Sequence, residues 1–300
     1  MLPLSRIVVL GAEGQIGSAL VAKLGGRAIP LNRAAADLSK PAELIATLES
    51  LSPDALINAA AYTAVDAAEA DEANCMAINA IAPKILAEWC AEKVIPFVDY
   101  STDYVFDGCG EKPWRETDAC QPLNVYGKSK LAGEQGVLAA GGESLIFRTS
   151  WVYDTRGKNF LTTMLRLGSE KEVIRVVSDQ FGAPSYAAHL ADATISCLDK
   201  AVEMESFPSG IYHMVNSGET SWHGFAEAIF AILSAEGVQL KIKDVEQISS
   251  LAYSTAAERP KNSRLNCSKL HTVFGERLPR WEQGLSAAME SLRASHRLSD

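Results

Sequence analysis

This sequence has few cysteines and histidines and no long apolar run. It carries six cysteines in 300 residues, with no C-x-x-C pair, and only five dispersed histidines. This pattern argues against a zinc knuckle, a redox dithiol and a bound metal, and unpaired thiols suit a reducing compartment. No apolar stretch reaches the roughly 18 residues that a membrane helix needs. We therefore predict a cytoplasmic protein with no membrane span and no metal site.

Positive charge is also scarce. Lys and Arg number 28 against 37 Asp and Glu, which gives a formal net charge of −9 without any Lys/Arg block. Such a surface repels phosphate, so we expect neither nucleic acid nor an anionic membrane as a partner. Small anionic ligands need only local positive charge and stay possible. The segment from Met1 to Arg6 lacks the basic and hydrophobic regions of a secretory leader, so none is expected.

The first half of the chain alternates between short apolar runs and longer helical stretches. The pattern predicts strands at 6–11, 28–31, 54–60, 94–100 and 144–149, and helices at 15–24, 41–51, 71–93 with a break near Pro83, and 122–138. Strands that alternate with helices of this length imply right-handed crossovers and a parallel sheet covered on both faces. The predicted fold is therefore α/β, a doubly wound parallel sheet of the Rossmann type.

The alternation loosens after about residue 152. Strands are expected at 173–177, 211–216 and 241–245, and helices at 188–200, 222–235 and 281–294. We predict a cofactor-binding Rossmann domain over 1–152 and a smaller, mainly substrate-binding C-terminal lobe over 153–300, with some later segments returning to the sheet. The chain beyond His296 is expected to be frayed.

Three glycines follow the first expected strand and open the first expected helix. Gly11, Gly14 and Gly17 have the spacing G-x-x-G-x-x-G. Glycine permits a tight turn and a close approach of pyrophosphate to the backbone, and the helix N-terminus supplies oriented N–H groups. A plain glycine-lined turn is the alternative, but its place on the first strand of a βαβ series favours dinucleotide binding.

The second expected strand ends at Arg33, where an acidic residue would hold the adenosine ribose. Arginine could instead pair with a 2′-phosphate. The hypothesis is that Arg33 selects NADPH over NADH, and a solvated surface arginine is the alternative.

A Tyr126–Lys130 pair lies four residues apart on a predicted helix, so the two side chains share one face. A neighbouring cation stabilises phenolate and lowers the pKa of the tyrosine, which could then donate a proton to a carbonyl that receives hydride. Thr102, at the end of the fourth strand, could hydrogen-bond that carbonyl. An ordinary strand threonine, and a turn cap for Asp103, are the alternatives.

Motifs of this kind occur along nearly the whole chain, in a fixed order. They are Gly11 to Gly17, Asp37 to Ser39 with Pro41, Asn58 to Asp66, Ser101 to Asp107, Pro122 to Glu134, Phe147 to Tyr153, Asp179 to Pro184 and Arg259 to Leu265. Together they resemble the extended short-chain dehydrogenase/reductase superfamily and, within it, the family of dTDP-4-dehydrorhamnose reductases.

The resemblance implies NAD(P)H-dependent reduction of the C4 ketone of dTDP-4-dehydro-β-L-rhamnose to dTDP-L-rhamnose. It implies a catalytic set of Thr102, Tyr126 as proton donor, and Lys130 at the nicotinamide ribose. The cofactor would be NADPH, with NADH possible, on Gly14, Gln15, Ile16, Asp37, Leu38, Ala61, Tyr62 and Thr63. The dTDP-sugar would contact Thr102, Asp103, Trp151, Arg259 and Asn262.

One departure from the family concerns metal. Some members form a dimer bridged by Mg²⁺ through two glutamates, and the matching positions here are Ala19 and Ala188. Neither can coordinate a hard cation, so we expect a monomer or weak dimer that is not metal-bridged. Two other functions stay open: a related NDP-sugar reductase or epimerase, and a non-catalytic binding protein like the regulatory subunit of methionine adenosyltransferase.

Overall fold

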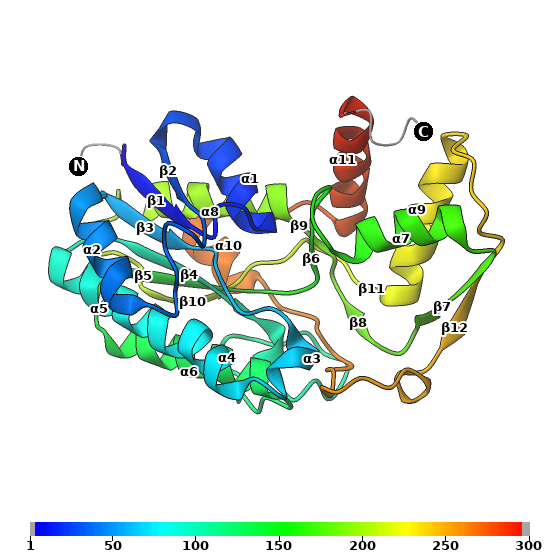
Figure 1. Cartoon of the computed structure of the whole chain (residues 1–300), viewed down its shortest axis with the longest axis horizontal. Helices are drawn as coiled ribbons and strands as arrows, with labels where there is room; N and C mark the ends of the chain where they lie inside the picture. The colour runs from blue at the N-terminus through cyan, green and yellow to red at the C-terminus, as the bar shows by residue number, and fades with distance from the viewer. Residues whose placement is uncertain (1–3, 296–300) are drawn as a thin grey trace.

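The computed structural model describes residues 4–295, and its centre is a parallel six-stranded sheet (Figure 1). The strand order is β2-β1-β3-β4-β5-β10. The strands are β1 (Ile7–Leu10), β2 (Ala28–Leu31), β3 (Ala55–Asn58), β4 (Phe97–Thr102), β5 (Ser144–Thr149) and β10 (Gly210–His213). All five neighbouring pairs are parallel, which confirms the predicted doubly wound α/β fold.

Helices cover both faces of this sheet because successive strand residues point to opposite faces. The covering helices are α1 (Gln15–Leu24), α2 (Pro41–Leu51), α5 (Ala82–Lys93), α6 (Val125–Ala139), α8 (Ala187–Ala201) and α10 (Ser268–Phe274). On one face, Ile7 and Val9 pack with α1, α8 and α10. On the other, Val8 and Leu10 pack with α2 and α5.

A second group of elements, toward the right of Figure 1, lies around a separate apolar cluster. Its helices are α7 (Phe160–Glu170), α9 (Trp222–Ala235) and α11 (Trp281–Ala294). Its short strands pair as β7 (Val173–Val177) with β12 (Asp244–Ile248), β8 (Phe181–Gly182) with β11 (Thr220–Ser221), and β6 (Val152–Tyr153) with β9 (Ser185–Tyr186). The segments α8, β10 and α10 belong to the sheet, although they come after residue 152 in the chain.

Element boundaries differ from the sequence prediction in places. The stretch predicted as one helix begins with α4 (Glu72–Met76), after the one-turn helix α3 (Val65–Ala68), and then widens into a π-helical segment at Ala77–Ile81. The break thus lies just before Pro83, which sits in the first turn of α5. The predicted helix at 122–138 begins at Val125, because the Asn124 side chain caps it by accepting from the Gly127 N–H at 2.8 Å. The residues beyond His296 lie outside the described part of the chain.

No helix among residues 4–295 is long and apolar enough to cross a bilayer.

Candidate active site

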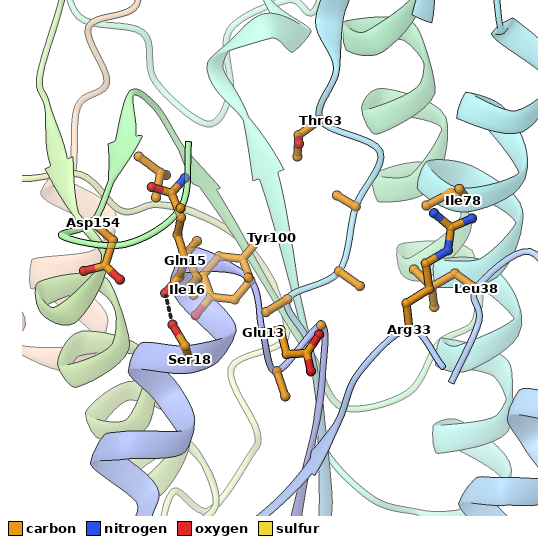
Figure 2. Close-up of a pocket in the computed structure, with 18 of the residues that line it drawn as sticks. Glu13, Gln15, Ile16, Ser18, Arg33, Leu38, Thr63, Ile78, Tyr100 and Asp154 are labelled. Atoms are coloured by element: carbon orange, nitrogen blue, oxygen red, sulfur yellow. Dashed lines mark hydrogen bonds between the residues drawn. The ribbon is translucent and has the colours of Figure 1, made fainter. Parts of the chain in front are cut away.

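A cavity of about 830 Å³ opens where the strand order reverses, between β1 and β3. Ligands of open α/β sheets bind at such a switch point, outside the carboxyl ends of the strands. Its lining includes most of the residues proposed from the sequence: Gly11, Gly14, Gln15, Ile16, Arg33, Asp37, Leu38, Ala61, Thr63, Tyr126 and Lys130. Figure 2 shows Arg33, Leu38 and Ile78 grouped at one end, away from Asp154.

The glycine loop is built so tightly that side chains cannot replace its hydrogens. Gly11 has a φ of +70°, and a Cβ there would lie 2.7 Å from the Ala60 nitrogen. A Cβ at Gly17 would lie 2.0 Å from the Gly11 carbonyl oxygen. The backbone at Gly11 therefore lies directly against Ala59 and Ala60, which follow β3. Gly17 does not line the cavity, and its missing side chain lets α1 pack directly on the Gly11 carbonyl.

This loop suits a dinucleotide. Gly14 is the N-cap of α1 and offers no side chain to bond the first N–H groups of the helix. The Gln15 Oε1 atom is buried without a hydrogen-bond partner among the described residues. An uncapped helix N-terminus with a partial positive charge is a favourable place for pyrophosphate. The residues present therefore fit the cofactor that the sequence predicted.

The end of the cavity at Arg33 and Asp37 carries both signs of charge. The Arg33 side chain is 78% exposed, and its Nε lies 3.9 Å from Asp37 Oδ2. Asp37 Oδ1 accepts from the N–H and hydroxyl of Ser39, and these hydrogen bonds lower the pKa of Asp37. Asp37 is therefore held in place by Ser39, whereas the Arg33 side chain is mostly exposed and only loosely paired with Asp37.

Tyr126 and Thr102 meet at the carboxyl end of β4. The two side chains share a hydrogen bond, and the Tyr126 ring packs edge-on against Tyr104 with centroids 5.5 Å apart. Burial raises the pKa of Tyr126, and the Thr102 hydrogen bond opposes only part of that rise. The predicted lowering of this pKa by Lys130 is wrong for the protein alone, since sequence spacing does not show burial. A raised pKa keeps the phenol protonated at neutral pH, as a proton donor requires.

Asp103 lies directly beside this pair. Thr102 Oγ1 donates to Asp103 Oδ1 at 3.1 Å, and also accepts from the Tyr104 N–H at 3.2 Å. The carboxyl is 1% exposed, and burial raises its pKa to about 7. Asp103 therefore titrates near neutrality next to the proposed proton donor.

The other proposed residues lie outside the cavity lining. Tyr62 hydrogen-bonds Asp71 through its hydroxyl at 3.2 Å. Trp151, at a φ of +50°, stacks on Trp222 with centroids 3.7 Å apart. Arg259 bonds the Tyr104 hydroxyl at 3.2 Å and pairs with Asp66 at 2.6 Å.

Asn262 is 1% exposed and is bonded within the chain at both ends of its amide. Its Nδ2 donates to the carbonyls of Cys109 and Lys112, at 3.3 and 2.9 Å, and its Oδ1 accepts from Arg264. The contacts therefore show Asn262 holding together the loops around it.

The cavity also contains residues that the sequence analysis missed. Asp154, Arg156 and Lys158 line it from the loop after β6, and Tyr100, Ser101 and Thr149 line it from the ends of β4 and β5. Tyr100, Ser101 and Thr149 lie at the carboxyl ends of the fourth and fifth strands, which was a usable signal because ligands gather at that edge of the sheet. Within the described residues, no cluster of three His, Cys, Asp or Glu side chains could hold a metal ion.

A glycine loop at the switch point, joined in one cavity to Tyr126 and Lys130, defines an NAD(P)-binding oxidoreductase of the short-chain dehydrogenase/reductase class. The family model described as the RmlD substrate binding domain matches residues 5–294. The chain belongs to the dTDP-4-dehydrorhamnose reductase family.

Named relatives support this placement. The chain is 45% identical to a dTDP-4-dehydrorhamnose reductase of Burkholderia thailandensis, over 96% of this chain and 99% of that one. It is 41% identical to one of Salmonella typhimurium, over 96% and 98%. A crystal structure of the Bacillus anthracis reductase in complex with NADP is similar at a TM-score of 0.88 and 34% identity, covering 96% of this chain and 99% of that one.

Proposed function

We propose that this chain reduces the C4 ketone of dTDP-4-dehydro-β-L-rhamnose to dTDP-L-rhamnose in the cytoplasm, with NADPH as the reductant. The observation that carries the proposal is the single cavity that joins the glycine loop to Tyr126 and Lys130. Nucleotide-sugar reduction needs a site that holds a dinucleotide and also presents a proton donor to the ketone.

Each group of residues has a part in this mechanism. When bound, the reduced nicotinamide supplies the hydride. The N-terminus of α1, with Gly14, Gln15 and Ile16, holds the pyrophosphate, while Asp37 and Leu38 border the adenine and Ala61 to Thr63 the nicotinamide side. Thr102 orients the ketone, and Tyr126 gives its phenolic proton to the ketone oxygen as negative charge develops there. Lys130 holds the nicotinamide ribose.

The substrate residues are proposed from the family resemblance. Thr102 and Asp103 contact the sugar beside Tyr126, and the partly exposed Trp151 forms part of the wall of the sugar site. Arg259 and Asn262 are proposed at the diphosphate side. Because Arg259 already pairs with Asp66, it would have to share its charge with the ligand.

A coupled assay tests the function directly. Enzymatically made dTDP-4-dehydrorhamnose should cause oxidation of NADPH, with dTDP-L-rhamnose as the product. Faster turnover of another 4-keto nucleotide sugar in a substrate panel would favour a related reductase or epimerase. No ketone-dependent oxidation, together with co-purification of a methionine adenosyltransferase, would favour the non-catalytic alternative.

Arg33→Ala tests the cofactor preference. If the guanidinium pairs with the 2′-phosphate, the variant should lower kcat/KM for NADPH about tenfold, the value of one charge-assisted hydrogen bond, and leave NADH unaffected. Lys40→Ala is the matched control, because Lys40 is an exposed cation that pairs with Glu43 outside the cavity. An unchanged NADPH/NADH ratio in Arg33→Ala would mean that Arg33 is only a solvated surface residue.

EDTA should leave the oligomeric state unchanged. Ala19 is buried on α1, which packs against α8, and neither Ala19 nor Ala188 carries an oxygen ligand. The α1–α8 contact is instead joined by Lys23–Asp192 and Arg27–Asp199 ion pairs, each at 2.8 Å. Light scattering during gel filtration, with and without EDTA, measures this. Dissociation of a dimer on chelation would contradict the proposal of a monomer or weak dimer without a metal bridge.

A further inference from the structure

Lys130 has a charged partner that the proposed mechanism does not use. Its Nζ lies 3.8 Å from Asp99 Oδ2, and the two side chains are only 3% and 2% exposed. Asp99 belongs to β4 and Lys130 to α6, so the pair joins the sheet to the helix that carries Tyr126. A lone ammonium buried this deeply would be costly, because burial disfavours the charged form.

Asp99 is itself held in a fixed orientation. Asn58, at the end of β3, donates from Nδ2 to Asp99 Oδ1 at 2.7 Å and is 1% exposed. The Oδ1 atom of the same asparagine accepts from the Ala60 N–H at 3.3 Å. Ala60 lines the cavity and touches the glycine loop. One short chain of contacts thus links the floor of the cofactor cavity to the ammonium of Lys130.

The other ionisable groups near the Lys130–Asp99 pair are either paired with another charge or neutral. Glu134, one turn after Lys130 on α6, binds Arg148 of β5 through two hydrogen bonds at 2.6 and 2.8 Å. Burial raises the pKa of Asp99 above its ordinary value, and the charge of Lys130 and the hydrogen bond from Asn58 oppose part of that rise. Cys75 of α4 lies near Lys130, and burial raises the pKa of its thiol, so it stays neutral at pH 7. Asp99 is therefore the carboxylate available to balance Lys130.

We propose that Asp99, oriented by Asn58, is the positioning residue that keeps Lys130 charged and in place beside Tyr126. Asp99 acts through Lys130 and does not line the cavity itself. The proposal rests on the function proposed above, since it assigns Lys130 to the active site.

Asp99→Asn removes the charge with little change in shape. Loss of a negative charge near the site favours the deprotonated form of Tyr126, so the alkaline limb of the pH profile of kcat/KM should move to lower pH by about one unit. Asp99→Glu keeps the charge and should restore the wild-type limb to within a few tenths of a unit. A fall in thermal stability alone, with an unmoved limb, would make Asp99 merely structural and overturn the proposal.

Glu134→Gln is the matched control, because it removes another buried carboxylate, one that is already paired with Arg148. The alkaline limb of the kcat/KM profile should move clearly less in Glu134→Gln than in Asp99→Asn. An equal shift in the two variants would overturn the proposal. Should Asp99→Asn fail to fold, Asp99→Ser removes the same charge with a smaller side chain.

A second readout does not depend on activity. In cofactor-free protein with ¹³C-labelled lysine, the Cε signal of Lys130, assigned by its loss in Lys130→Arg, should change its chemical shift at pH 7 in Asp99→Asn relative to wild type, because its partner 3.8 Å away has lost its charge. An identical Cε chemical shift would refute the pairing even if the reductase assay succeeds. A clear difference would uphold the pairing even if the proposed substrate proves wrong.

Discussion

Tyr126→Phe is expected to lower kcat about 10²- to 10⁴-fold, the usual contribution of a positioned proton donor. The substitution removes only the phenolic O–H, and the remaining ring can keep its edge contact with Tyr104. The glycine loop lies on different elements of the chain, so NADPH should still bind. Steady-state NADPH oxidation gives kcat, and quenching of protein fluorescence by NADPH gives Kd.

Tyr104→Phe is the matched control for this experiment. Tyr104 is a neighbouring half-buried phenol whose hydroxyl accepts from Arg259 at 3.2 Å. Loss of that hydrogen bond should cost kcat about tenfold or less. Near wild-type turnover of Tyr126→Phe would remove Tyr126 from the role of proton donor. An equal loss in both variants would point to damage of the shared tyrosine packing instead.

The sheet could be predicted from the sequence because its strands are continuous apolar runs. Residues 7–10 and 55–57 are fully buried on both faces, as in a parallel sheet covered by helices. The two-residue strands such as β6 and β9 were missed, because so short a pairing leaves no periodic pattern. The start of α6 was misplaced because a side-chain cap at Asn124, rather than hydrophobic periodicity, sets it.

In the candidate active site, local sequence motifs could be predicted, whereas contacts that depend on tertiary packing could not. The glycine loop is a local motif, and its spacing alone indicated a backbone that approaches its ligand closely. The Tyr126–Lys130 pair was visible as a helical spacing, but its electrostatics were not. Asp99 lies 31 positions before Lys130, so only the packing of α6 on β4 reveals that Lys130 faces a carboxylate. Burial, which raises the pKa of Tyr126, likewise comes from tertiary structure.

Gly17→Ala should damage both folding and cofactor binding. The new Cβ would lie 2.0 Å from the Gly11 carbonyl oxygen and 2.7 Å from its carbon, and both are backbone atoms of the loop. The same oxygen accepts from the Gly14 N–H at 2.9 Å, so relief of the clash must distort the turn that presents α1 to the pyrophosphate. Overpacking against backbone costs about 3 kcal/mol of unfolding free energy. Urea denaturation measures this loss, and NADPH titration should show at least about tenfold weaker binding.

Gly26→Ala separates this effect from a general cost of losing a glycine. Gly26 lies at the other end of α1, where a Cβ would meet no heavy atom within 4 Å and the backbone has no positive φ. Such a surface change should alter the unfolding free energy by no more than about 0.5 kcal/mol and leave NADPH affinity unchanged. If Gly17→Ala bound NADPH as tightly as Gly26→Ala, the loop would not be the pyrophosphate cradle. If it bound weakly while keeping wild-type stability, distortion of the loop alone would explain the loss, and the cradle would stand.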